Sequence, residues 1–162
     1  MDRGVLRRPS VADWVLTAKA LAAFSLLAVP FGLFSGLFAF KLADDPAEIA
    51  KIALIIFFVP ALFEEVLFRG PVVWLSFIGS RKLLYVAALS LGLFVLWHPL
   101  NGMFLMTEAR GLFTDWRFLF LAALLGLVAT HLAIKTRCIW PPVVFHWLVV
   151  VGWKVFLGGP QF

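Results

Sequence analysis

The sequence predicts an all-α fold, a polytopic bundle of about five transmembrane helices around an intramembrane polar site. Composition is the first reason, since 63% of the 162 residues are hydrophobic and only 14% are charged. A soluble domain is about 45–50% apolar and about 25% charged, so this chain is expected to be an integral membrane protein. The second reason is a succession of apolar segments near the ~20 residues that a span needs, separated by short polar breaks.

A single membrane domain is expected to cover residues 1–162. Within it, residues 1–19 are expected to form a cytoplasmic lead-in, and residues 52–153 hold the motifs that carry chemistry. The expected helices follow the apolar segments and cover residues 20–40, 52–78, 83–98, 117–134 and 139–157. Residues 41–51 and 103–115 are the polar connections on the side of the membrane opposite the N-terminus.

Proline and glycine predict where these helices start and stop. Pro46 suits the first turn of the second helix, because proline has no N–H that a first turn would need to satisfy. Gly70-Pro71 is expected to kink or end that helix. Pro99, followed by the Asn101-Gly102 turn signal, is expected to end the third helix at His98.

The basic residues of the chain are interpreted as topology signals. The net charge is +5, but the 14 Lys and Arg residues stand at the ends of apolar segments and form no basic stripe. We therefore expect contact with the lipid bilayer and no binding of nucleic acid. Alternation of the spans places nine of them on the N-terminal side, which favours a cytoplasmic N-terminus. Cys138 is the only cysteine, so no disulfide can form within the chain.

Three ionisable side chains lie within six residues of the apolar run 52–78: Glu64, Glu65 and Arg69. One charge at the bilayer centre costs about 2.5–3.5 kcal/mol on insertion scales, so such residues indicate a functional site. Glu65 and Arg69 are four residues apart on one helix face, which predicts an ion pair. Glu64 lies about 100° around the helix and is the candidate reactive carboxylate. The alternative is that all three form only a polar packing network.

Two histidines in other helices are candidates to meet Glu64. Phe94 precedes His98 by one turn on the same face, where its ring is expected to pack against the imidazole. Taken alone, a histidine at the end of a membrane helix, such as His98, is more often an interfacial residue than a catalytic one. His146 lies deeper in its apolar segment and is expected to be buried. His131 stands near a helix end among basic residues, and an interfacial position is expected for it.

The three motifs, in this order and each in an apolar helix, resemble the CAAX-protease and bacteriocin-processing (CPBP, or Abi) family of glutamic-type intramembrane endopeptidases. The residues that carry the resemblance are Glu64-Glu65-x-x-x-Arg69, Phe94-x-x-x-His98 and His146, with the lead-in 136–142. It covers roughly residues 52–153. Members commonly have eight helices, so the chain is similar to a short, bacterial form located in the cytoplasmic (inner) membrane.

The resemblance implies hydrolysis of a peptide bond in a membrane-associated, lipidated or C-terminally sorted protein. Glu64 would be the general base that activates water, and His98 would hold and polarise that water. His146 would stabilise the oxyanion or assist proton transfer. Glu65 and Arg69 would support the base.

Val150 departs from the family pattern, in which an Asn commonly follows the last histidine by four residues. Asn101 is a candidate substitute for that donor. Loss of one oxyanion donor typically costs about 10²–10³ in rate, which impairs an enzyme without abolishing its activity. The alternative is a non-catalytic membrane binding or immunity module of the same fold.

The sequence leaves alternatives on two further points: whether the site binds a metal, and whether its residues lie at the same depth in the membrane. Glu64, His98 and His146 is a ligand set found in hydrolytic zinc sites, although the resemblance favours hydrolysis without a metal or other cofactor. Alternating spans place His98 near the outer membrane face and Glu64 in mid-span. The two meet only if the third helix stops short and the Pro99 turn lines a cavity. An ion pathway is disfavoured, because residues 20–40 and 117–134 offer almost no polar side chains.

Overall fold

The computed structural model describes residues 5–160, and this part of the chain is built from helices alone. The α-helices are, in chain order, α1 (Val11–Phe34), α2 (Pro46–Ile56), α3 (Phe63–Ile78), α4 (Leu83–Phe104), α5 (Arg110–Phe113), α6 (Trp116–Thr136) and α7 (Trp140–Phe156). A π-helical segment, Phe57–Leu62, joins α2 to α3, and a 3₁₀ turn, Thr107–Ala109, precedes α5. Since residues 5–160 contain no strand, the predicted all-α fold is confirmed.

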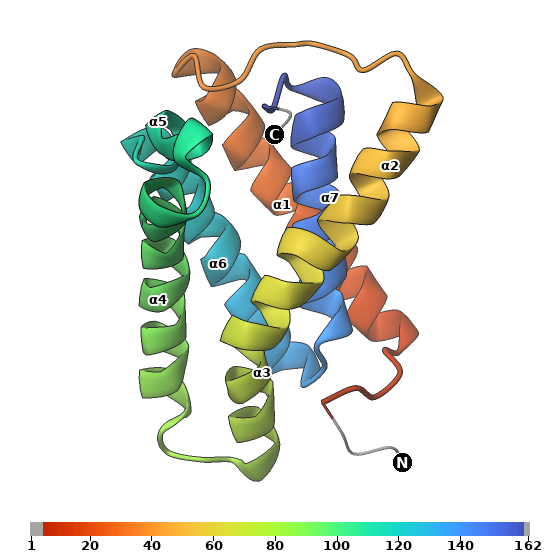
Figure 1. The fold of residues 1–162 in the computed structure, drawn as a ribbon. Helices are drawn as coiled ribbons and strands as arrows, with labels where there is room; N and C mark the ends of the chain where they lie inside the picture. Colours follow the sequence, from red (N-terminus) through yellow and green to blue (C-terminus); the bar gives the residue numbers. More distant parts are fainter. Residues whose placement is uncertain (1–4, 161–162) are drawn as a thin grey trace.

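The long helices run up and down beside one another, and α2 and α3 together make one pass that is broken in the middle (Figure 1). The described chain thus makes five helical passes: α1, α2 with α3, α4, α6 and α7. Helices α1, α4 and α6 are long and apolar enough to cross a membrane, and α7 is a shorter apolar helix. The start of α1 and the end of α7 lie at opposite ends of the bundle.

Helix α6 holds the bundle together, because it packs against α1, α3, α4 and α7. The apolar core follows this helix and includes aromatic rings from its neighbours; its buried members include Phe24, Phe68, Phe94, Leu121, Leu125, Leu132 and Phe145. Many large apolar side chains instead face outward, among them Leu26, Leu84 and Leu127. Outward-facing leucines on long apolar helices are the pattern of a surface in contact with lipid tails.

Helix α1 begins nine residues earlier than the expected start at Ala20. Ser10 and Asp13 form a capping box: the Asp13 N–H donates to Ser10 Oγ at 3.3 Å, and the Ser10 N–H donates to Asp13 Oδ2 at 2.7 Å. The helix ends at Phe34 rather than Phe40, and Gly36 follows with φ +73°, in the left-handed region. The expected lead-in is therefore helical from Val11 onward.

The break in the second pass lies at Val59, not at Gly70-Pro71 as expected. Val59 has φ −137° and ψ 114°, values outside the helical region. Pro71 instead lies inside α3, which continues to Ile78. A residue before proline is pushed out of the helical region partly by its own Cβ, and Gly70 has none. Pro46 stands at the first turn of α2, as predicted.

Helix α4 also continues past its predicted end, through Pro99 to Phe104. The expected stop at His98 is therefore wrong, and His98 lies more than one turn inside the helix. Part of the expected connection 103–115 is helical as well, since it contains the 3₁₀ turn and α5. These short elements lie at the end of the bundle opposite the α3–α4 turn (Figure 1).

The close packing of α6 against α3 and α4 can be tested by a substitution at Gly126. A Cβ at this position would lie 2.8–2.9 Å from Leu91, Arg69 and Phe94, closer than packed atoms tolerate. We expect Gly126→Ala to lower the free energy of unfolding by about 1–3 kcal/mol through overpacking. Gly92→Ala is the matched control, since a Cβ at Gly92 meets no heavy atom within 4 Å. Thermal unfolding in detergent micelles measures both, and equal stability of the two variants would contradict this packing.

Candidate active site

The acidic motif begins α3, immediately after the break in the second pass. Glu65 and Arg69 are both completely buried, and Arg69 Nε lies 3.3 Å from Glu65 Oε2. The predicted ion pair is confirmed. The guanidinium also lies 4.0 Å from the centroid of the Phe94 ring, and Arg69 Nη2 donates to the Gly126 carbonyl oxygen at 3.1 Å. Arg69 is thus held by a carboxylate, a ring face and a backbone oxygen from three different helices.

Glu65 makes a second contact that the sequence did not predict. Its other oxygen, Oε1, lies 2.9 Å from Nδ1 of His146, which is 2% exposed. The expected burial of His146 is confirmed. Because a carboxylate only accepts hydrogen bonds, Nδ1 carries the proton in this contact. Glu65 therefore links Arg69 of its own helix to His146 of α7.

Glu64 faces another neighbour, in agreement with its expected position around the helix. Its Oε1 accepts a hydrogen bond from Trp97 Nε1 at 3.1 Å. Within residues 5–160, its Oε2 has no hydrogen-bond partner, although the residue is buried. Trp97 was missed by sequence reasoning, and its position beside His98 was the one available signal. The tryptophan thus fixes one carboxylate oxygen, and the other has no partner among the described residues.

His98 is buried in α4 and held by its own helix. Its Nδ1 lies 2.9 Å from the Phe94 carbonyl oxygen, which can only accept, so Nδ1 is the donor and Nε2 the acceptor nitrogen. The Phe94 ring packs against the imidazole edge-on, at 5.0 Å between centroids. Phe113 and Phe118 also contact the imidazole ring. The predicted Phe94–His98 contact is confirmed, and the His98 side chain is buried rather than exposed at an interface, which was the alternative for this residue taken alone.

The difficulty over depth disappears once the true helix ends are known. Glu64 lies 14 residues before the end of α3, and His98 lies 15 residues after the start of α4. At 1.5 Å of rise per residue, both lie about 21–23 Å from the turn that joins these helices. Glu64 and His98 reach the same cavity because they lie at similar distances from the turn of the α3–α4 hairpin. No early stop of α4 is needed.

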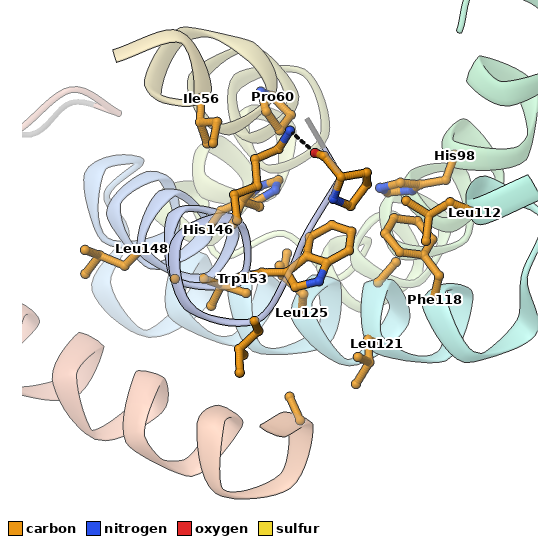
Figure 2. Close-up of a pocket in the computed structure, with 18 of the residues that line it drawn as sticks. Ile56, Pro60, His98, Leu112, Phe118, Leu121, Leu125, His146, Leu148 and Trp153 are labelled. Atoms are coloured by element: carbon orange, nitrogen blue, oxygen red, sulfur yellow. Dashed lines mark hydrogen bonds between the residues drawn. The ribbon is translucent and has the colours of Figure 1, made fainter. Parts of the chain in front are cut away.

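A cavity of about 600 Å³ brings the candidate residues together, and Glu64, His98 and His146 all line it. Figure 2 shows His98 and His146 entering the cavity from different helices, with the Trp153 indole beside them. Most of the other lining residues are aliphatic or aromatic. Asn101 and Val150 line the same cavity. His131 is exposed on α6, as expected, and does not line it.

The arrangement of possible metal ligands can be described for residues 5–160. Among residues 5–160, no three His, Cys, Asp or Glu side chains come together as a group that could hold a metal ion. His146 contacts Glu65 through Nδ1, which is also how a histidine that binds metal through Nε2 is commonly oriented by a carboxylate. Glu64 is bound by Trp97 through Oε1, and its Oε2 has no partner among the described residues.

The fold and the site define a class of protein: an integral membrane helical bundle that encloses a carboxylate and two histidines in an apolar cavity. Residues 46–152 match the type II CAAX prenyl endopeptidase Rce1-like family, which is a family of proteases. The chain therefore belongs to this family, and the resemblance seen in its motifs is confirmed. Searches of curated proteins and of solved structures return no significant match.

Glu65 offers a direct test of this buried network. Glu65→Gln keeps the shape of the side chain but leaves the Arg69 charge without its counterion, so we expect a loss of about 3–5 kcal/mol in unfolding free energy. Glu48→Gln is the control, because Glu48 is only half-buried and its pairing with Lys51, at 3.6 Å, is a surface contact. Thermal and denaturant unfolding in micelles measure the difference. Wild-type stability of Glu65→Gln would show that Arg69 is neutralised in another way.

Proposed function

We propose that this protein is an intramembrane endopeptidase that hydrolyses a peptide bond with a glutamate-activated water. One observation carries the proposal: Glu64, His98 and His146 line one cavity inside a membrane bundle, and each is oriented by a different partner. Trp97 orients Glu64, the Phe94 carbonyl orients His98 and Glu65 orients His146. Groups held in this way are preorganised for catalysis. Membership of a protease family supports the same reaction.

Each group has a role that its contacts support. Glu64 Oε2 takes a proton from water as the water oxygen attacks the carbonyl carbon, and returns it to the leaving amine when the C–N bond breaks. His98 accepts a hydrogen bond from that water at Nε2. His146, protonated on both nitrogens, donates from Nε2 to the oxyanion, and the Glu65 carboxylate stabilises the imidazolium. Arg69 holds Glu65 in place for this task.

The substrate we propose is a membrane-associated protein with a lipidated or C-terminally sorted tail. The cavity wall is largely aliphatic and aromatic, and α1 and α2 contribute to it as well as the site helices. Such a wall suits an apolar chain or a lipid group and offers little to a polar soluble peptide. The family name itself describes action on prenylated tails.

Val150 supports a second candidate function. This apolar side chain lines the cavity at the position where the resemblance implies an Asn donor, and an incomplete oxyanion site suits a membrane module that binds peptides without cleaving them. Asn101 lines the cavity too and is the proposed replacement donor. The two candidate functions predict different results when Glu64 is changed.

Glu64→Gln is the decisive variant for proteolysis. Removal of the base should lower the cleavage rate by about 10²–10⁴-fold, while fold and binding persist because the side chain keeps its shape. We would compare membrane-protein termini by mass spectrometry in cells that express wild type, Glu64→Gln or the control Glu48→Gln at matched levels. New termini in wild type and Glu48→Gln that vanish in Glu64→Gln support the protease and identify its substrate. Identical termini in all three favour the binding module.

The same assay distinguishes metal-free hydrolysis from zinc chemistry. We expect purified protein to retain its activity after treatment with EDTA or 1,10-phenanthroline. Zinc bound by Glu64, His98 and His146 predicts the opposite, a loss that added Zn²⁺ reverses.

We further propose that the protein resides in a bacterial cytoplasmic membrane with its N-terminus in the cytoplasm, on the strength of its basic-residue distribution. The exposed residues Arg81 and Glu108 lie beyond opposite ends of α4. In a Cys138→Ala background, an impermeant maleimide should label Glu108→Cys in intact spheroplasts. Arg81→Cys should react only after lysis. The reverse pattern would overturn this orientation.

A further inference from the structure

The last described residues fold back over the cavity that holds the candidate catalytic groups. Helix α7 ends at Phe156, and the chain reverses at Gly158, whose φ of +68° lies in the left-handed region. The Gly159 N–H then donates to the Trp153 carbonyl oxygen at 3.1 Å. Pro160, at the end of this reversal, lines the cavity together with His98 and His146.

A second segment fixes the place of this reversal. The Ala39 N–H donates to the Leu157 carbonyl oxygen at 3.2 Å, and the Ala43 N–H donates to the Val155 carbonyl oxygen at 2.9 Å. A Cβ on Gly158 would lie 3.1 Å from the Ala39 carbonyl oxygen. A stretch of backbone is thus held inside a cavity that we assign to a peptide substrate.

Lys154 binds that stretch of backbone. Its Nζ donates to the Pro160 carbonyl oxygen at 2.6 Å, the contact drawn as a dashed line in Figure 2. Lys154 is the one Lys or Arg among the described residues that line the cavity. An ammonium group forms strong, charge-assisted hydrogen bonds, and Lys154 is partly buried beside the apolar wall of the cavity. One partner of this ammonium group is a main-chain oxygen of a peptide.

We propose that Lys154 is a specificity-determining residue, whose ammonium group binds a main-chain oxygen of the substrate peptide where the Pro160 carbonyl oxygen now lies. This inference rests on the proposed function and adds to it a second point of attachment for the substrate. Either kind of peptide oxygen, an internal carbonyl or a terminal carboxylate, can accept the hydrogen bond that the ammonium group donates. The Leu157–Pro160 segment occupies the place that the substrate would take, so the substrate must displace it.

The spacing along α7 sets the distance between this anchor and the cleaved bond. Lys154 follows His146 by eight residues, which is about 12 Å along a helix axis. An extended peptide covers that length in about three to four residues. We therefore expect the anchored oxygen to lie three to four residues from the bond that Glu64 and His146 act upon.

Binding to an inactive enzyme tests the proposal apart from catalysis. The probe is a fluorescein-labelled peptide with an S-farnesyl cysteine followed by three residues, made once with a C-terminal acid and once with an amide. Its Kd is measured by fluorescence anisotropy with full-length Glu64→Gln protein in nanodiscs. We expect Lys154→Met on this background to raise Kd about 10–100-fold, the usual effect of losing a hydrogen bond to a charged group.

Three companion variants complete this test. Lys154→Arg keeps a charged donor and should restore binding to within about threefold, while Lys154→Gln provides a second neutral variant in case Lys154→Met does not fold. Lys51→Met, at an exposed lysine of α2 that does not line the cavity, should leave Kd unchanged. Thermal unfolding confirms that the variants compared are folded.

Each outcome has a defined meaning. Weaker binding of both peptides supports contact with an internal carbonyl, and weaker binding of the acid alone supports contact with a terminal carboxylate. An unchanged Kd for both peptides overturns the role of Lys154. Cleavage of the probe by the protein with Glu64 intact is measured separately. A protein that binds through Lys154 but never cleaves would overturn the protease and leave this inference standing.

Discussion

The structure depends on one constraint, which is that a charge inside a membrane bundle must be neutralised by other protein groups. Arg69 is completely buried, and its counterion Glu65 is buried as well. Glu65 meets this need and at the same time holds His146 by its second oxygen. Because removal of either partner would leave a charge in a low-dielectric interior, the network that stabilises α3 against α7 also sets the geometry of the site. Stability and the orientation of a candidate catalytic group come from the same carboxylate.

Glu64 is buried like Glu65, but its carboxylate is not fully paired with other groups. It neighbours Glu65 in the sequence, yet it has a single hydrogen bond, from Trp97, and one oxygen without a partner among the described residues. A buried carboxylate that is left partly unsatisfied costs free energy, and such a cost is expected where a group is kept for chemistry. The division of labour between adjacent glutamates follows from the 100° that separates neighbouring residues on a helix.

Sequence patterns predicted the contacts between residues of one helix in this site and missed the contacts between residues far apart in the sequence. The Glu65–Arg69 pair and the Phe94–His98 contact follow from a spacing of four residues, which helix geometry fixes whatever the tertiary fold. The Glu65–His146 contact joins residues 81 apart, and no spacing rule predicts which of two adjacent carboxylates a distant histidine will meet. The predicted helix ends were wrong where proline was taken as a stop signal. Helix α3 continues through Pro71, which follows a glycine, and α4 continues through Pro99, because neighbouring helices support both. For the same reason, His98 was wrongly predicted to lie at the end of its helix.

The family match covers only part of the chain that surrounds the cavity. Glu64, His98 and His146 lie within the matched range 46–152, whereas α1 and the Lys154–Pro160 segment lie outside it. The reaction that we propose uses groups from the shared part, while the proposed anchor and one apolar wall come from outside that range. Specificity for a substrate depends on the contacts that distinguish one peptide from another, and α1 and the end of α7 add residues of their own to the cavity wall. The match therefore covers the three groups to which we assign the reaction, while part of the cavity wall that would contact a substrate lies outside it.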